Sequence, residues 1–210
     1  MKKNERGMVR KVLEFSEIHV FFKKLISGRN QNNEIIMELL PNRARGMRIL
    51  DLGCGTAEIL DSISGEKAYV GIDYNKKYIE SASSKYKERI TARFVCTDLN
   101  TYAKKCEEKF DLVLMIGVLH HVCDKDADLA INSVQELLAD EGQFVSLDCC
   151  LTRPMNPIAW VLCKLDRGKY VRYKDEWVSL MKKHWDKVWY KIRTDTLVLP
   201  YSIILFKNMK

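Results

Sequence analysis

The chain has 210 residues, of which 47% are hydrophobic and 30% are charged. These proportions exclude a disordered chain, a collagen-like repeat and a coiled-coil rod, and a chain of this length can fold without a disulfide or a structural metal. Its 35 basic and 28 acidic residues leave a net charge of +7, which favours anionic partners in general and does not by itself imply nucleic acid.

The cysteines and the apolar runs indicate the cellular environment of the protein. The seven cysteines are an odd number without a Cys-x-x-Cys pair, and no signal peptide precedes them, so we expect a reducing, cytoplasmic environment. The longest apolar run, residues 112–119, is far shorter than the roughly 20 residues that span a bilayer. We therefore expect a soluble protein without a membrane span.

The first 46 residues are predicted to be helical. Apolar residues recur at three- and four-residue intervals through residues 8–25, which is typical of an amphipathic helix. A shorter helical pattern over residues 34–40 must end before Pro41, because the residue before a proline avoids the helical region.

Residues 48–150 alternate between short apolar runs and helical patterns. The strand-like runs cover residues 48–52, 68–73, 93–96, 111–116 and 143–148, and helical patterns cover residues 57–63, 76–86 and 126–139. Strands that alternate with helices form right-handed crossovers and a parallel sheet. We therefore predict an α/β fold with a doubly wound, mainly parallel sheet.

The last third departs from this alternation. Trp177, Met181 and Trp185 mark an amphipathic helix, and two extended runs follow at residues 188–194 and 197–206. The connection between these runs is too short for a parallel crossover, so they are expected to form an antiparallel C-terminal hairpin. We expect a single domain with N-terminal helices (1–46), a cofactor-binding core (47–150), and a substrate lid and closing hairpin (151–210).

A glycine-rich turn follows the first predicted strand. Gly53 and Gly55 permit backbone angles and close approaches that a side chain would block. The third glycine of the dinucleotide-binding pattern is replaced by Glu58, and a carboxylate there would repel a pyrophosphate. With Asp51 also present, the turn suits a positively charged ligand better than a nicotinamide dinucleotide.

Two further acids end the next two predicted strands. Asp73 lies 22 residues beyond Asp51, where a carboxylate can accept bonds from both hydroxyls of a ribose. Asp98 ends the third strand and can accept a bond from an adenine amino group. Taken singly, Asp73 also fits a helix cap and Asp98 also fits an ordinary turn residue.

Four motifs in order, DLGCGT at residues 51–56, GID at 71–73, CTDL at 96–99 and GVLHH at 117–121, resemble those of class I S-adenosylmethionine-dependent methyltransferases. The resemblance covers residues 47–150 and implies a Rossmann-like fold, methyltransferase activity and S-adenosylmethionine as the cofactor. It also implies cofactor-binding roles, which fall on Asp51, Gly53, Cys54 and Gly55 for the methionine part, Asp73 and Tyr74 for the ribose, Asp98 and Leu99 for the adenine, and Ile116 and Gly117 beside the cofactor.

Methyl transfer requires an aligned nucleophile and the exclusion of water, with no metal. For a hydroxyl acceptor a base helps, and His120 and His121, directly after the fourth strand, are the candidate catalytic residues. A packing or helix-start role is the alternative for both. Asp148, at the end of the fifth strand, is a second candidate base or a substrate ligand.

The segment 164–174 carries five basic residues and two tyrosines and is interpreted either as a solvated loop or as a lid over the acceptor. Arginine suits phosphate and carboxylate groups, so an acidic or phosphorylated acceptor would meet this segment. The candidate substrate-binding residues are Asp148, Arg167, Arg172 and Tyr173, together with Arg193 and Tyr201 on the closing hairpin.

The residues and the resemblance together predict a methyltransferase that acts on a small molecule, most simply on a hydroxyl of an anionic metabolite or sugar. The tail resembles, loosely, that of small bacterial methyltransferases with such acceptors. Alternatives are an RNA or protein methyltransferase and a non-catalytic cofactor-binding partner protein. Nucleic acid is not expected, because no added domain interleaves basic and aromatic residues, and the Asn/Asp-Pro-Pro-Tyr signature is absent after the fourth strand. The sequence leaves the acceptor atom, the use of a base and the oligomeric state open.

Overall fold

The structure is a computed structural model, and it describes residues 38–40, 44–165, 169–194 and 202–210. The amphipathic helix expected at residues 8–25 lies outside the described residues, as do Arg167 and Tyr201.

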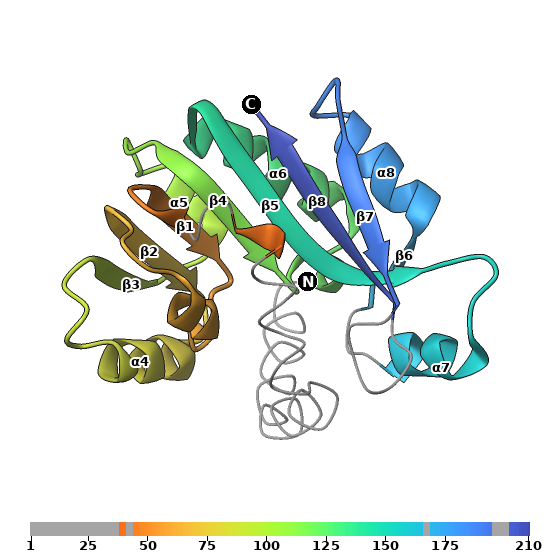
Figure 1. Cartoon of the computed structure of the whole chain (residues 1–210), viewed down its shortest axis with the longest axis horizontal. Helices are drawn as coiled ribbons and strands as arrows, with labels where there is room; N and C mark the ends of the chain where they lie inside the picture. The colour runs from red at the N-terminus through yellow and green to blue at the C-terminus, as the bar shows by residue number, and fades with distance from the viewer. Residues whose placement is uncertain (1–37, 41–43, 166–168, 195–201) are drawn as a thin grey trace, which may run out of the picture.

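A mixed sheet forms the centre of the molecule, with strand order β3-β2-β1-β4-β5-β8-β7 and a short β6 that pairs with β5 (Figure 1). The strands are β1 (Arg48–Leu52), β2 (Ala68–Asp73), β3 (Ala92–Cys96), β4 (Phe110–Ile116), β5 (Leu138–Leu151), β6 (Arg172–Tyr173), β7 (Trp189–Arg193) and β8 (Ile203–Met209). The first five strands are parallel, whereas β8 is antiparallel to both β5 and β7. The predicted α/β fold with a Rossmann-like sheet and an antiparallel C-terminal hairpin is confirmed.

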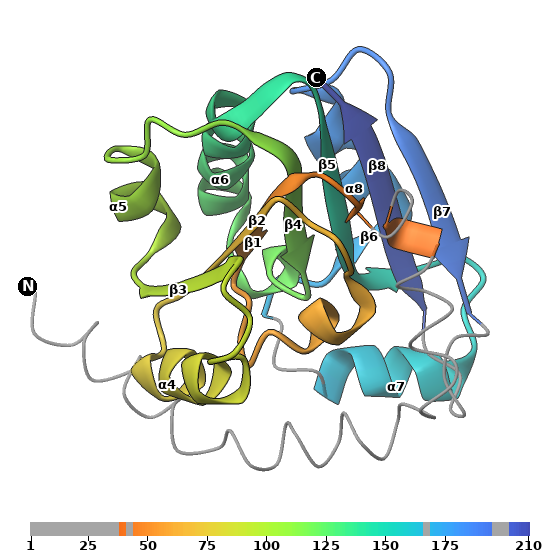
Figure 2. The same cartoon turned by 60° about the vertical axis from the view of Figure 1, so that its left-hand side comes forward.

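The helices are α4 (Lys76–Lys85), α5 (Leu99–Ala103), α6 (Asp124–Leu137), α7 (Pro157–Leu165) and α8 (Lys174–Lys182), with two 3-10 turns, η3 (Glu58–Ser62) and η4 (Leu119–His121). Figure 2 shows α5 and α6 on one face of the sheet, and α4 and α7 near the edge where the parallel strands end. Within the described residues, no helix combines the length and the apolar character that a membrane span requires.

Each face of the sheet carries its own hydrophobic core. On one face Val113 and Phe144 pack with Ile131 of α6 and Trp177 of α8, and all four side chains are fully buried. On the opposite face, residues of β1, β4 and β5 pack against η3 and against Leu39. Parallel strands covered on both faces need continuous apolar runs, which is why the sequence signal for these strands is strong.

Several predicted bounds differ from the observed ones: the helix predicted at residues 126–139 is α6 at Asp124–Leu137, and β8 runs to Met209, beyond the end predicted at residue 206. The helix expected at residues 57–63 is only the 3-10 turn η3, because Ala57 takes a left-handed conformation with φ of 56° and delays any regular helix. Strand β5 begins at Leu138, five residues earlier than predicted, and contains Glu141 with φ of 61°. None of these differences moves the ends of the strands at the site.

Strands β1, β2 and β4 end at the same edge of the sheet. Their pairing is parallel, with Leu52 opposite Ile72 and Asp51 opposite Leu114. The segments that follow these strands therefore meet, and this is the edge at which open α/β sheets bind ligands.

Candidate active site

The glycine turn after β1 is hydrogen-bonded to the neighbouring strand β2. The backbone N–H groups of Gly53 and Cys54 donate to the carbonyl oxygen of Ile72 at 2.8 and 3.0 Å. Gly53 has φ of 75°, and a Cβ at this position would lie 2.7 Å from Cγ2 of Val118. Only glycine fits there, since both the backbone angle and the space exclude a side chain.

Asp73 joins this turn to the start of α4. One carboxylate oxygen accepts from the N–H of Gly55 at 3.1 Å, and the other accepts from the N–H of Asn75 at 2.7 Å. Burial raises the pKa of Asp73, and the two backbone hydrogen bonds oppose that rise. Each carboxylate oxygen keeps a further lone pair, so both hydroxyls of a ribose can still be bound.

Asp51 is buried at the end of β1, where its carboxylate accepts from the hydroxyl of Tyr69 at 2.5 Å. The side chain of Cys54 packs against Gly71 of β2. A Cβ added to Gly71 would lie only 2.9 Å from the sulfur of Cys54. Burial raises the pKa of the Cys54 thiol. These contacts make Cys54 a packing residue of the turn and leave its thiol unreactive.

The space beside two glycines at this edge of the sheet is open to a ligand. A Cβ on Gly55 would meet nothing within 4 Å, and a Cβ on Gly117 would meet only Cε1 of His120, at 3.8 Å. Two missing side chains thus leave a cradle between the turns after β1 and β4, with the carboxylate of Asp73 at its rim. Ile116, the last residue of β4, is partly buried next to Gly117.

The residues predicted to lie around the adenosine occupy different environments. Tyr74 follows Asp73 and is 64% exposed. Asp98 is the N-cap of α5, and its carboxylate accepts from the N–H and the hydroxyl of Thr101 at 3.0 and 2.7 Å. These bonds lower the pKa of Asp98. Leu99 is partly buried against the core.

His120 and Asp148 form a buried pair at the ends of β4 and β5. Nδ1 of His120 lies 2.7 Å from Oδ1 of Asp148, and the backbone N–H of His120 donates to the same oxygen at 3.1 Å. The two side chains are 8% and 2% exposed. Burial raises the pKa of Asp148, and the hydrogen bond from His120 lowers it in part. An imidazole bonded to a carboxylate can act as a general base where its other ring nitrogen reaches an acceptor.

His121 is exposed, and its ring lies 4.0 Å from the ring of His120, centroid to centroid. The two rings are in contact at an interplanar angle of 42°, and Nδ1 of His120 is bonded to Asp148. Of the two candidate bases, the geometry favours His120.

The prediction that Arg172 binds an acceptor anion is wrong. Arg172 is 5% exposed, and four of its five N–H groups donate to acceptors of the protein itself. Its guanidinium also lies over the ring of Trp177, 4.7 Å from the centroid. Arg172 therefore belongs to the packing beneath the site.

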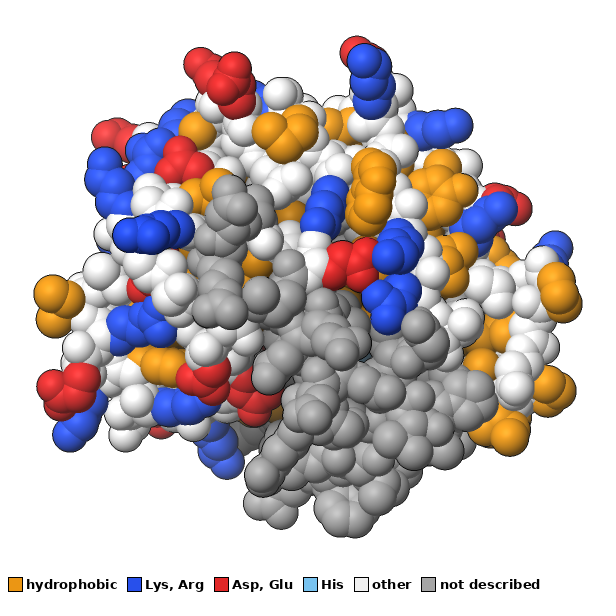
Figure 3. Space-filling model, in the orientation of Figure 1, with side chains coloured by type: hydrophobic (Ala, Val, Ile, Leu, Met, Phe, Trp, Pro, Cys, Tyr) orange, Lys and Arg blue, Asp and Glu red, His pale blue; other side chains and the backbone are white. Residues whose placement is uncertain are grey.

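The remaining predicted substrate residues are dispersed. Arg193 pairs with Glu38 at 2.7 Å, in a group that includes Lys191 and Lys207 and appears as a red patch among blue side chains in Figure 3. Tyr173, at the start of α8, lies under the guanidinium of Arg153, 4.1 Å from the ring centroid.

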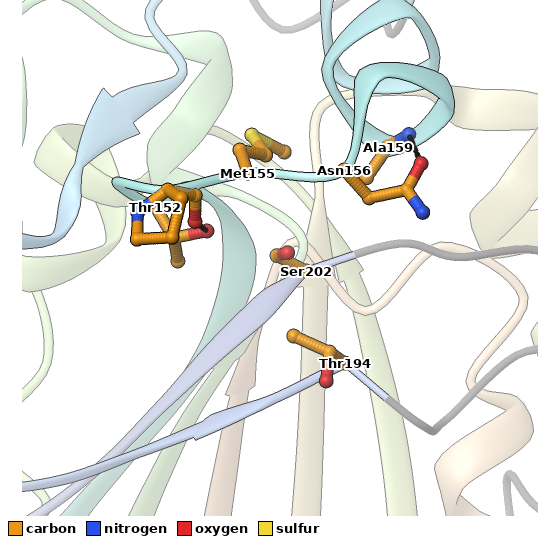
Figure 4. A pocket seen from close by; sticks show the side chains of 7 residues that line it. Thr152, Met155, Asn156, Ala159, Thr194 and Ser202 are labelled. Carbon is orange, nitrogen blue, oxygen red and sulfur yellow. Dashed lines mark hydrogen bonds between the residues drawn. The ribbon is translucent and has the colours of Figure 1, made fainter.

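A cavity of about 260 Å³ lies where β5 ends, between the start of α7 and the ends of β7 and β8 (Figure 4). Its polar lining comes from Thr152, Asn156, Thr194 and Ser202, and no charged residue lines it among the described residues. The sequence carries no signal of this cavity, because the residues of its two walls lie 35 to 50 positions apart in the chain and form no motif.

Comparison with known proteins identifies the class. The family described as "Methyltransferase domain" matches residues 43–193, and the chain therefore belongs to it. The N-methyltransferase NodS from Bradyrhizobium japonicum WM9, solved with S-adenosyl-L-homocysteine, is 16% identical, with a TM-score of 0.66 and 86% of each chain covered. Magnesium protoporphyrin IX methyltransferase from Synechocystis PCC 6803, also with this product bound, is 15% identical, with a TM-score of 0.71 and coverage of 98% and 99%.

A curated human relative, "Probable tRNA methyltransferase 9B", is 31% identical over 111 residues, which are 52% of this chain and 23% of that protein. The chain thus matches about a quarter of the length of this relative. The predicted membership of a methyltransferase family is confirmed.

Proposed function

We propose that this chain transfers a methyl group from S-adenosylmethionine to a hydroxyl of a small, polar, uncharged acceptor such as a sugar, with His120 as the general base. The observation that carries the proposal is the buried contact of 2.7 Å between His120 and Asp148, beside the cradle at Gly117. We also propose that residues 47–150 bind the cofactor and residues 151–210 cover the acceptor, within one domain.

In this proposal the edge of the sheet orients the cofactor, which when bound supplies an electrophilic methyl group. Asp73 binds the ribose hydroxyls with its remaining lone pairs, and Asp98 and Leu99 hold the adenine. The turn from Asp51 to Gly55 lies along the methionine part. The strand ends fix these groups before any ligand arrives, which reduces the entropy lost when the reactants are aligned.

His120 then accepts the proton of the acceptor hydroxyl. Donation of Nδ1–H to Asp148 leaves Nε2 as the nitrogen that takes up a proton. The buried carboxylate stabilises the resulting imidazolium, and the backbone bond from His120 to the same oxygen keeps the ring in place.

The charges around the site support an uncharged acceptor. The donors of Arg172 are bonded within the fold, and Arg193 pairs with Glu38. Among the described residues, the cavity at the end of β5 is lined by apolar side chains and by neutral hydroxyl and amide groups. Neutral groups of this kind bind hydroxyls well, whereas they leave a phosphate without a countercharge.

An RNA acceptor is a second candidate function, favoured by the 31% identity to a probable tRNA methyltransferase and by the net charge of +7. In that case binding should weaken steeply with salt, because each neutralised phosphate releases counterions.

Methyl transfer from labelled S-adenosylmethionine to a panel of neutral sugars, sugar phosphates and total tRNA tests the proposal, with His120→Gln as the inactive variant and His184→Gln, at a histidine paired with Asp128, as the matched control. The proposal expects label on a neutral hydroxyl compound, lost in His120→Gln and kept in the control. Label on tRNA or on a phosphorylated compound alone would contradict it, as would transfer that His120→Gln leaves unchanged.

A further inference from the structure

Arg172 is buried against the segment that follows β4. Its donors reach Oδ1 of Asp124 at 2.8 Å and the carbonyl oxygens of Leu119, Tyr170 and Val122 at 2.9, 3.2 and 2.8 Å. A buried guanidinium is costly unless hydrogen bonds satisfy it. These four bonds compensate the burial and tie three backbone carbonyls and one carboxylate to one rigid, planar group.

Two of those carbonyls belong to the turn that carries His120. Turn η4 contains few bonds of its own, from the N–H of His121 to Val118 at 3.1 Å and from the N–H of Val122 to Leu119 at 3.4 Å. Short 3-10 turns have poor hydrogen-bond geometry and hold their shape weakly. The turn is therefore held largely by groups outside it.

The segment around β6 supplies these outside groups. Arg172 bonds to the carbonyls on either side of His120, and the N–H of Tyr170 donates to the carbonyl of His120 itself at 3.1 Å. Strand β6 in turn pairs with the end of β5, with Arg172 opposite Cys150. The turn after β4 is thus bound to the strand that carries Asp148.

Trp177 provides a second link between Arg172 and β5. Its fully buried ring lies under the guanidinium of Arg172, 4.7 Å from the ring centroid. Its indole N–H donates to the carbonyl of Cys149 at 3.1 Å, one residue beyond Asp148. Replacement of Arg172 would therefore remove the bonds to the turn that carries His120 and the contact with Trp177, which is bonded next to Asp148. Both losses would leave His120 less firmly held against Asp148.

We propose that Arg172 is a positioning residue that holds turn η4 against β5 and so keeps Nδ1 of His120 bonded to Asp148. This inference rests on the proposed function of His120 as the base. It gives the segment 170–172 a role in arranging the base, in place of the acceptor contact predicted for Arg172 from the sequence.

Proton–nitrogen NMR of the histidine side chains in the full chain tests the inference without an acceptor. In the parent protein we expect a slowly exchanging Nδ1–H signal from His120, assigned by its loss in His120→Gln. In Arg172→Lys one ammonium cannot bond to four separated acceptors, so this proton should exchange about tenfold faster or disappear.

Arg89→Lys is the matched control. Arg89 also donates to a carboxylate, that of Glu66, and to the carbonyls of Leu60 and Ile63. Its replacement should lower stability yet leave the His120 signal unchanged. Equal exchange in the parent and Arg172→Lys, or equal loss in Arg172→Lys and Arg89→Lys, would overturn the inference.

If Arg172→Lys does not fold, Asp124→Ala removes one of the four bonds of the guanidinium at an exposed carboxylate and should speed the same exchange by a smaller factor; an unchanged rate rejects the inference. Where an acceptor is found, Arg172→Lys should also alter the pH profile of kcat and leave the KM for S-adenosylmethionine unchanged. Absence of methyl transfer in the parent would reject the proposed function alone, because the NMR result does not depend on turnover.

Discussion

His120 and Asp148 contact each other at 2.7 Å although 28 positions separate them in the chain. The contact exists because β4 and β5 are parallel neighbours, so that a residue after the first strand reaches the end of the second. Oδ2 of Asp148 has no hydrogen-bond partner among the described residues. The stability of the charged carboxylate thus depends largely on His120, which makes the two side chains one functional unit.

This dependence predicts the effect of Asp148→Asn. The amide keeps the size of the side chain but no longer carries a charge that stabilises protonated His120, so kcat should fall by about 10² or more. Binding of S-adenosylhomocysteine should stay within about twofold of the parent, because Asp148 lies outside the cradle. Steady-state kinetics and calorimetry on one preparation check both. An unchanged kcat would assign the pair to packing alone.

The two glycines of the turn should respond differently to alanine. In Gly53→Ala the new methyl group would lie 2.7 Å from Val118, whose branched side chain moves little, so we expect a loss of about 1 to 3 kcal/mol in the free energy of unfolding. Val118→Ala in the same chain should recover the steric part of this loss.

In Gly55→Ala the new methyl group meets no atom within 4 Å. The free energy of unfolding should therefore fall only by the cost of the left-handed backbone conformation, about 1 to 2 kcal/mol. The methyl group, however, projects into the cradle. We therefore expect Gly55→Ala to weaken S-adenosylhomocysteine binding more than its stability loss explains. Urea denaturation with calorimetry separates the two effects, and parent-like affinity in Gly55→Ala would show that the cradle lies elsewhere.

Glu66 predicts a specific pH dependence of stability. Its hydrogen bonds with Arg89 lower the pKa of this nearly buried carboxyl to about 2, against the opposing effect of burial. Because the unfolded chain binds the proton more tightly, the stabilisation is present above pH 4.5 and is lost as the pH falls towards 2.

Glu66→Gln should therefore be less stable than the parent near neutral pH, and the difference should shrink as the pH falls from about 5 to 2.5. Urea midpoints at several pH values measure it. Glu108→Gln, at an exposed ion pair with Arg93, is the control and should change stability by at most about 1 kcal/mol. A difference between parent and Glu66→Gln that is constant with pH would contradict the assignment.

The sequence predicts the sheet and the tight turn after β1 well, for physical reasons. Strands buried on both faces must be continuously apolar, and a turn as tight as that at Gly53 has few alternatives to glycine. The sequence also brings His120 near Asp148, because His120 follows the fourth predicted strand, Asp148 ends the fifth, and the crossover pattern places these strands side by side.

Other features depend on tertiary contacts that no local pattern encodes. Arg172 resembles a surface arginine in the sequence, and only the packing of β6 on β5 shows that backbone carbonyls bind it. The five-residue helix α5 is too short to show a period, although Asp98 as its N-cap is a signal that could have located it. The cavity at Thr152 and Thr194 forms where two distant segments meet.

The most direct test of the cofactor edge is isothermal titration calorimetry of S-adenosylhomocysteine with the parent and with Asp73→Asn. The account predicts saturable binding at one site per chain in the parent, and an affinity about 10- to 100-fold weaker in Asp73→Asn, the loss expected for hydrogen bonds to a charged group. No binding by the folded parent, or equal affinity in the two proteins, would contradict it.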